Sequence, residues 1–119
     1  MLNEAQVREF AEAWVKAWNA HDLEAILGHY AEDVVLVSPT AARLLGDASG
    51  TVRGITGLRS YFARGLQAYP QLEFELVDVM WGIASVLLYY KNQSGSMTGE
   101  FMELDANGKV VRVVANYSR

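Results

Sequence analysis

The stretch from Leu72 to Ser118, LEFELVDVMWGIASVLLYYKNQSGSMTGEFMELDANGKVVRVVANYS, decides the fold of this 119-residue chain. Its apolar residues recur with a period of about two, which is typical of strands. Two turn sequences interrupt it at residues 93–95 and 106–108, and the second contains an Asn-Gly pair that favours a tight hairpin. The pattern predicts an antiparallel meander, with strands over 72–81, 83–92, 96–105 and 109–118.

Helices are predicted ahead of this meander. Apolar residues at three- and four-residue spacing between residues 3 and 20, Trp14 among them, mark one face of a first helix. Asp22 is placed to cap a short second helix. Thr56 is placed to cap a third, which Pro70 ends.

A short strand lies between the second and third predicted helices. Residues 34–37 are four apolar residues suited to a buried strand, and Ser38-Pro39 closes it because proline cannot donate to a ladder. We interpret residues 40–54 as a loop folded over an opening. Helices first and a meander afterwards predict one α+β domain over residues 1–119, in which a bent sheet encloses a cavity.

Composition excludes several function classes. The formal charge is −4 without a Lys/Arg cluster, so neither nucleic acid nor an anionic membrane is an expected partner. No stretch has the roughly 18 apolar residues that a membrane span needs, and residues 1–10 contain no apolar export segment. The chain has no cysteine, which excludes disulfides and thiolate chemistry. We therefore expect a cytoplasmic protein.

Two phrases carry a resemblance over nearly the whole chain. AWNAHDLEAI at 17–26 and ELDANGKVV at 103–111 are similar to the opening and the last hairpin of the SnoaL-like proteins, which belong to the nuclear-transport-factor-2-like (ketosteroid isomerase-like) superfamily. The resemblance implies a cystatin-like, cone-shaped α+β barrel: three N-terminal helices on a strongly curved, mostly antiparallel sheet around an apolar pocket. It also implies a homodimer formed through the outer face of the sheet.

The same resemblance relates three functional positions of the isomerases to residues of this chain. Where the isomerases of this superfamily have an oxyanion-binding tyrosine, this chain has Trp14, which donates one hydrogen bond but is no acid. Where they have an aspartate base before a proline, it has Ser38, which lacks an adjacent base. Their protonated aspartate corresponds to Glu100, a case of carboxyl donation that is well established for ketosteroid isomerase. Steroid-type isomerisation is therefore not expected, and Glu100 is the candidate catalytic acid or donor.

Several further residues are candidates for the pocket wall. Their structural alternatives are core packing for the aromatic residues, a backbone hydrogen bond for Ser38 and a solvated surface position for Arg43. Tyr89 is interpreted as core, and Asp78 as the site of a bulge that shifts the alternation. The expected lining comprises Trp14, Tyr30, Ser38, Tyr61, Thr98, Met102, Val113, Ala115 and Tyr117, with Arg43 as a contact in the loop over the opening.

No cofactor or metal is expected. His21 and His29 do not have the spacing of a paired-histidine metal motif, and no phosphate loop or nucleophile elbow is present. Three functions stay open: a cofactor-free acid–base isomerase, cyclase or hydrolase acting on a small apolar molecule, a binding domain without catalysis, and a dimeric interaction module.

Overall fold

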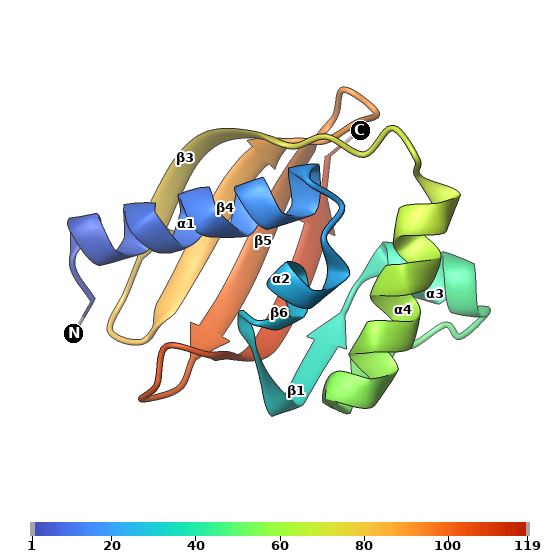
Figure 1. Cartoon of the computed structure of the whole chain (residues 1–119), viewed down its shortest axis with the longest axis horizontal. Coiled ribbons are helices and arrows are strands. Elements are labelled where there is room, and N and C mark those ends of the chain that lie inside the picture. Colours follow the sequence, from blue (N-terminus) through green and yellow to red (C-terminus); the bar gives the residue numbers. More distant parts are fainter. Residues whose placement is uncertain (1, 119) are drawn as a thin grey trace.

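A curved six-stranded sheet is the frame of the computed structural model, which describes residues 2–118 (Figure 1). The strand order is β2-β1-β6-β5-β4-β3, and every neighbouring pair is antiparallel except β1 and β6, which are parallel. The predicted α+β class and the mostly antiparallel sheet are confirmed. The strands are β1 Tyr30–Val37, β2 Thr51–Arg53, β3 Glu75–Trp81, β4 Ser85–Lys91, β5 Met97–Leu104 and β6 Val110–Tyr117.

Four helices accompany the sheet: α1 Glu4–Asn19, α2 Leu23–Leu27, α3 Pro39–Leu45 and α4 Gly54–Ala68. Asn3 and Gln6 form a reciprocal capping box that starts α1, and Asp22 caps α2 by accepting from the backbone of Ala25. Both caps satisfy amides that the first helical turn leaves free.

Three expectations need correction. The segment expected to be a loop contains α3 and β2, because Ser38 and Pro39 both end a strand and start a helix. The third predicted helix, α4, begins at Gly54 and follows Arg53, so Thr56 is not its cap. The sheet is not closed into a barrel, because β2 and β3 lie at its two ends without pairing to each other.

The bulge predicted at Asp78 is confirmed. The register of β3 against β4 shifts between Leu76 and Asp78, and the Asp78 carboxylate accepts from the backbone of Val79. Past the shift, Val79 is buried while Met80 is exposed. The bulge therefore sets which residues of β3 face the helices.

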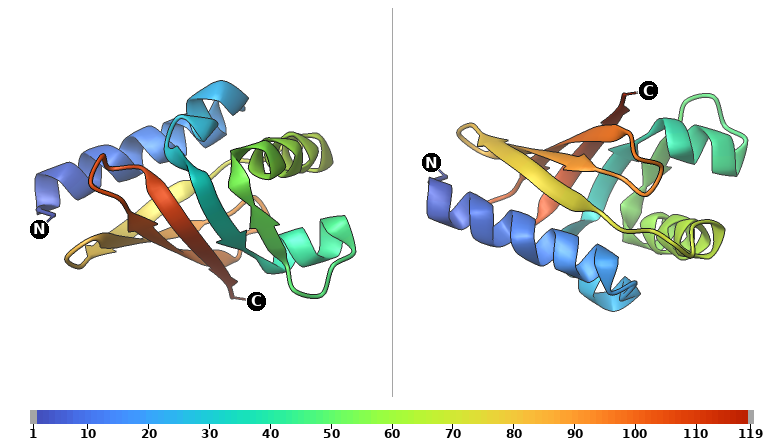
Figure 2. Two further views of the ribbon diagram at one scale, coloured as in Figure 1. Left: turned by 90° about the horizontal axis from the view of Figure 1, so that it is seen from below. Right: turned by 90° about the horizontal axis from the view of Figure 1, so that it is seen from above.

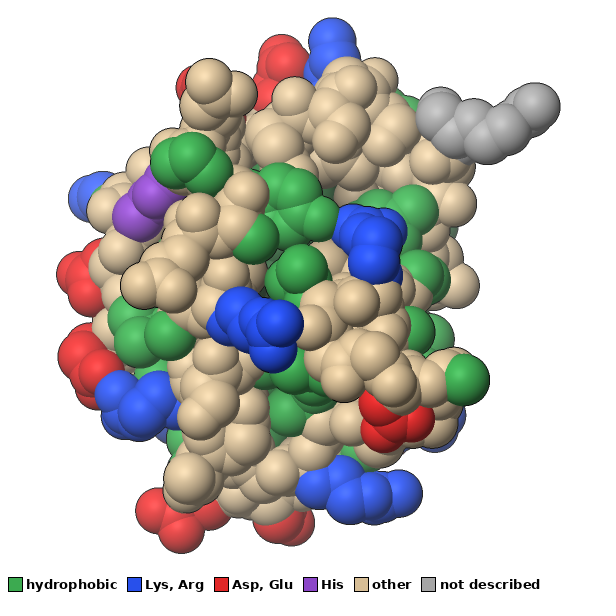
Figure 3. Space-filling view, turned by 90° about the vertical axis from the view of Figure 1, so that its right-hand side faces the viewer, with side chains coloured by type: hydrophobic (Ala, Val, Ile, Leu, Met, Phe, Trp, Pro, Cys, Tyr) green, Lys and Arg blue, Asp and Glu red, His purple; other side chains and the backbone are tan. Residues whose placement is uncertain are grey.

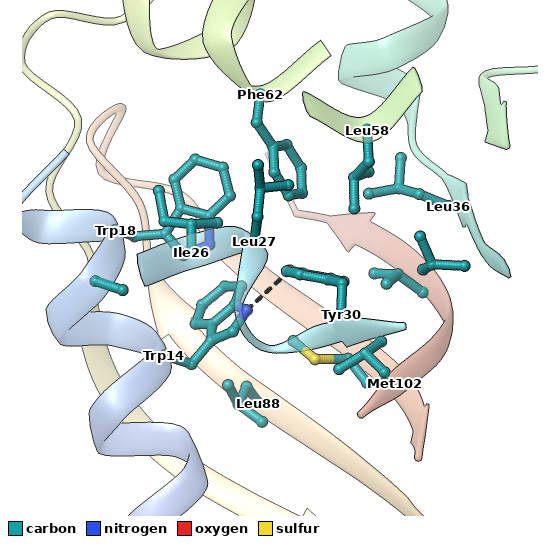
Figure 4. Close-up of a cluster of buried hydrophobic side chains, with 14 of the residues drawn as sticks. Trp14, Trp18, Ile26, Leu27, Tyr30, Leu36, Leu58, Phe62, Leu88 and Met102 are labelled. Carbon is teal, nitrogen blue, oxygen red and sulfur yellow. Dashed lines mark hydrogen bonds between the residues drawn. The ribbon is translucent and has the colours of Figure 1, made fainter. Parts of the chain in front are cut away.

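The core lies between the helices and one face of the sheet. Figure 2 shows α1, α2 and α4 on the same side of the sheet, and α1 packs against β3 while α4 packs against β1. Tryptophan, tyrosine and aliphatic side chains fill this layer, and the Trp14 indole donates to the Tyr30 hydroxyl at 2.9 Å (Figure 4). No helix formed by residues 2–118 covers the opposite face, called here the outer face (Figure 2). Within residues 2–118 no helix is both long and apolar enough to cross a membrane.

Candidate functional site

A cavity of about 320 Å³ opens at the end of the molecule where α3 and α4 lie. Side chains of α1, α3 and α4 and of strands β4 to β6 form its wall. Figure 3 views this end and shows hydrophobic side chains in a hollow with Lys or Arg side chains beside it. The volume lies near the lower end of the usual range for small-molecule sites, roughly 300–1,000 Å³. The cavity therefore suits a compact ligand.

Glu100 is the acidic side chain on this wall. It lies in β5 on the face shared with Thr98 and Met102, and only 7% of its surface is exposed. The Tyr90 hydroxyl on the neighbouring strand β4 donates to Glu100 Oε1 at 2.7 Å. Burial raises the pKa of Glu100 to about 7, although the hydrogen bond from Tyr90 opposes this by stabilising the carboxylate. Near neutral pH the carboxyl can thus both hold and release a proton.

Stacked aromatic rings form the apolar part of the wall. Trp14 stacks on Phe74 with ring centroids 5.7 Å apart and planes 16° apart, and Tyr90 packs against Phe74 at 4.4 Å. Trp18 meets Phe62 edge to face at 4.8 Å. Rings of this kind present flat faces to a planar ligand. Tyr90 in this set is also the hydrogen-bond partner of Glu100.

Hydroxyl groups form a polar part of the wall near the C-terminus of β1. Ser38 Oγ accepts from the backbone of Thr40, which caps α3, and lies 3.5 Å from the Tyr117 hydroxyl. Gly50 holds this corner closed: its φ is +60°, and a Cβ there would lie 2.5 Å from the carbonyl oxygen of Ser38. The chain therefore needs glycine at this position to bring Ser38 to the wall.

Arg43 and Tyr69 lie at the rim. Arg43 is on α3, one turn beyond Ser38, and its Nη2 donates to the Tyr69 hydroxyl at 2.6 Å. Tyr69 is the residue that ends α4, so this bond links the two helices across the cavity. It places a guanidinium group beside the opening.

The structure brings together most, but not all, of the residues that sequence reasoning singled out. Glu100, Trp14, Ser38, Tyr61, Thr98, Ala115, Tyr117 and Arg43 all line the cavity. Tyr30, Met102 and Val113 are buried in the core, with at most 6% of their surface exposed, and are not part of the wall. Tyr30 is turned toward the Trp14 indole, which occupies its hydroxyl. Buried side chains occur both in the core and on the cavity wall, so burial alone does not distinguish the two groups.

Sequence reasoning missed Tyr90, the hydrogen-bond partner of Glu100. Tyr90 alternates with Val86 and Leu88, and all three are buried on β4. The adjacent Tyr89, interpreted from the sequence as core, lies on the outer face with 38% of its surface exposed. Residues 86–90 are apolar or aromatic at every position, so no alternation in the sequence separates Tyr90 from Tyr89. Trp18 and Phe74 were likewise missed as wall residues.

Neither His21 nor His29 lines the cavity. His21 is in the turn after α1 with φ of 54°, and its Nε2 lies 2.9 Å from the carbonyl oxygen of Leu72. His29 is in the turn before β1 rather than on a helix surface, and its ring meets Phe10 edge to face. Burial lowers the pKa of His29. Within residues 2–118 no three His, Cys, Asp or Glu side chains converge as metal ligands.

Comparison with known proteins places this geometry in a family. A family model described as a SnoaL-like domain matches residues 11–114. A SnoaL-like protein of unknown function from Burkholderia thailandensis is 33% identical, with 98% of each chain covered and a TM-score of 0.94. No protein of curated function matches the sequence significantly.

Two more distant solved structures share the fold. A provisionally assigned isomerase of the SnoaL-like family from Agrobacterium tumefaciens is 18% identical, covers 97% of this chain and 99% of its own, and has a TM-score of 0.77. A provisionally assigned polyketide cyclase from Sinorhizobium meliloti is 12% identical, with 97% and 100% covered and a TM-score of 0.77. At these identities the likeness concerns the fold alone.

Proposed function

Because the chain belongs to the SnoaL-like family, we propose that it is a cofactor-free acid–base enzyme acting on a compact, largely apolar small molecule. The reaction class is isomerisation, cyclisation or hydrolysis, in which a proton moves to or from the substrate. The observation that carries the proposal is Glu100, a buried carboxyl on a cavity wall whose pKa is raised to about 7. A pKa near the working pH is what general acid–base catalysis requires.

In this mechanism Glu100 donates its proton to a substrate oxygen. Tyr90 holds one carboxyl oxygen through its 2.7 Å hydrogen bond and stabilises the carboxylate left after proton transfer. The aromatic wall positions the apolar part of the substrate. Tyr61 and Tyr117 line the same cavity and supply phenol groups that orient polar atoms of the substrate.

The test begins with a ligand. Compact ketones, lactones and epoxides are screened for an increase in melting temperature, and each compound that stabilises the protein is then followed for conversion by mass spectrometry. Turnover of such a compound should fall at least 100-fold in Glu100→Gln, which cannot donate an acidic proton, while binding persists. Glu103→Gln, on the outer face of the same strand, is the matched control and should keep full activity. Unchanged turnover in Glu100→Gln would contradict the proposed role of Glu100 as the proton donor.

A second candidate function is ligand binding without catalysis, and the hydrogen-bond contacts of Ser38 favour it. Its Oγ caps α3 and lies near Tyr117, and no carboxylate or imidazole bonds to it within residues 2–118. A serine in this arrangement is no base. If this candidate is right, ligands bind without conversion and Glu100→Gln changes affinity only modestly.

We also propose that the protein forms a homodimer through the outer face of the sheet. Met80, Leu87, Phe101 and Val114 form an apolar row across strands β3 to β6 there. Glu103 and Arg112 pair on the same face at 3.5 Å. In a two-fold contact the same patch meets itself, so an acidic and a basic group side by side allow opposite charges to meet.

A further inference from the structure

We propose that the ligand of this cavity carries a carboxylate, held at the rim by Arg43, while its apolar body lies against the aromatic wall. The proposal rests on the proposed function and deepens it, since it replaces a purely apolar ligand with one that has an anionic end and a flat apolar body. Glu100 would then meet a second, uncharged oxygen of the same molecule.

Charge balance at the rim supports an anion. Arg43 is the cationic side chain that lines the cavity, and none of the ion pairs between described residues includes it. The carboxyl group of Glu100, which also lines the cavity, is bonded to Tyr90 and lies in the middle of β5. The guanidinium therefore lacks a carboxylate partner among residues 2–118, and a ligand carboxylate would supply one.

The count of hydrogen-bond donors points the same way. Arg43 has five N–H donors, and the structure gives one of them an acceptor, the Tyr69 hydroxyl. The Tyr69 oxygen accepts in that bond, so its own proton stays free to donate. The hydroxyls of Ser38 and Tyr117, which lie 3.5 Å apart, are further polar groups on the same wall. Arg43 is exposed and has donors only, so its remaining N–H groups can meet a group that only accepts, as a carboxylate does.

The bond to Tyr69 also gives Arg43 a fixed orientation. A guanidinium held at one nitrogen loses less freedom when a carboxylate binds, and its planar fork matches the two carboxylate oxygens. A lysine at this position would keep the charge but not the two-pronged geometry. Arg43 is thus proposed as the residue that sets ligand specificity.

The experiment compares a charged and an uncharged ligand of the same shape. Binding of 2-naphthoate and 2-naphthamide to the unaltered protein is measured by titration calorimetry at pH 7.5. We expect naphthoate to bind about tenfold or more tightly than naphthamide, the difference that a charge-assisted hydrogen bond produces. Arg43→Gln should remove this preference, lowering affinity for naphthoate about tenfold to a hundredfold while leaving naphthamide unchanged. Arg43→Lys should retain only part of the preference for naphthoate over naphthamide.

Arg64→Gln is the matched control, because Arg64 is an exposed arginine of α4 that does not line the cavity. Equal losses in both variants would show a general charge effect and overturn the proposal. So would equal binding of naphthoate and naphthamide, or failure of naphthoate to bind at millimolar concentration. Failure of the proposed function looks different: the carboxylate preference persists in Glu100→Gln and in the unaltered protein, but no bound compound is converted.

Discussion

Glu100 gives the stability of this protein a pH dependence that a neutral side chain there would not. Burial raises its pKa from an ordinary value near 4.5 to about 7. The folded state therefore favours the protonated form, so this contribution is complete below pH 4.5 and is lost as pH rises through 7. At 1.36 kcal/mol per pKa unit, the loss is about 3 kcal/mol by pH 8.

Glu100→Gln removes this loss. The amide keeps an oxygen for the Tyr90 hydroxyl and carries no charge at any pH. We expect the variant and the parent to have similar free energies of unfolding at pH 4.5, and the variant to be more stable by up to about 3 kcal/mol at pH 8. Urea denaturation at both pH values measures the difference. A difference between variant and parent that is the same at both pH values would mean that folding does not raise the pKa of Glu100.

The face on which Glu100 lies was predictable, but its partner was not. Alternation along 96–105 groups Glu100 with Thr98 and Met102, and the structure has all three buried. The choice between Tyr89 and Tyr90 depends on the register of β4 against β5, in which Leu88 lies opposite Glu100. Register is a contact between strands, and two adjacent tyrosines give little local sign of it.

At the scale of elements, the corner that joins β1, α3 and β2 positions the polar part of the site. Ser38-Pro39 is typical both of a strand end and of a helix start, in which serine is the cap and proline the first helical residue, and in the structure it is both. The residues after it have mixed polarity and end in a glycine-containing turn, so they give a weak helical pattern. The seven-residue helix α3 depends on packing and on its cap more than on its own pattern.

Gly50 should therefore be much less replaceable than another glycine of the same segment. Gly46 and Gly50 have φ of +65° and +60°, but a Cβ on Gly46 meets nothing within 4 Å, whereas one on Gly50 meets the Ser38 carbonyl oxygen at 2.5 Å. We expect Gly46→Ala to cost about 1 kcal/mol and Gly50→Ala clearly more, about 3 kcal/mol, because strain and collision add. Urea denaturation of both variants measures this. Equal losses of unfolding free energy in the two variants would mean that the backbone near Ser38 adjusts readily to a Cβ at position 50.

At the scale of the whole molecule, the parallel pairing of β1 with β6 determines which surfaces stay open. It joins the N-terminal strand to the meander, and a bulge-like shift between Tyr30 and Val35 accompanies it. The meander itself was predictable because its turns are local signals. The β1–β6 pairing connects residues about 80 apart in the chain and has no local signature. In the described part of the chain, the resulting open sheet has one face without helices, as Figure 2 shows.

That outer face should hold two copies of the chain together. Met80 and Tyr89 have 56% and 38% of their surface exposed there, beside the partly buried Phe101. A stable contact between two copies is expected to bury about 1,600 Å² in total, which the apolar row and its neighbours must supply. Sedimentation velocity at micromolar concentration should therefore show a dimer, and Phe101→Lys should shift it to a monomer by placing a charge in the centre of the contact.

Leu45→Lys separates this effect from a general change in solubility. Leu45 is also a large hydrophobic residue with 40% of its surface exposed, but it lies on α3, away from the outer face. The same substitution there should leave the dimer intact. Because the cavity is lined by side chains of one chain, the Phe101→Lys monomer should still bind 2-naphthoate. A parent protein that sediments as a monomer would contradict the dimer while leaving the acid–base role of Glu100 untouched.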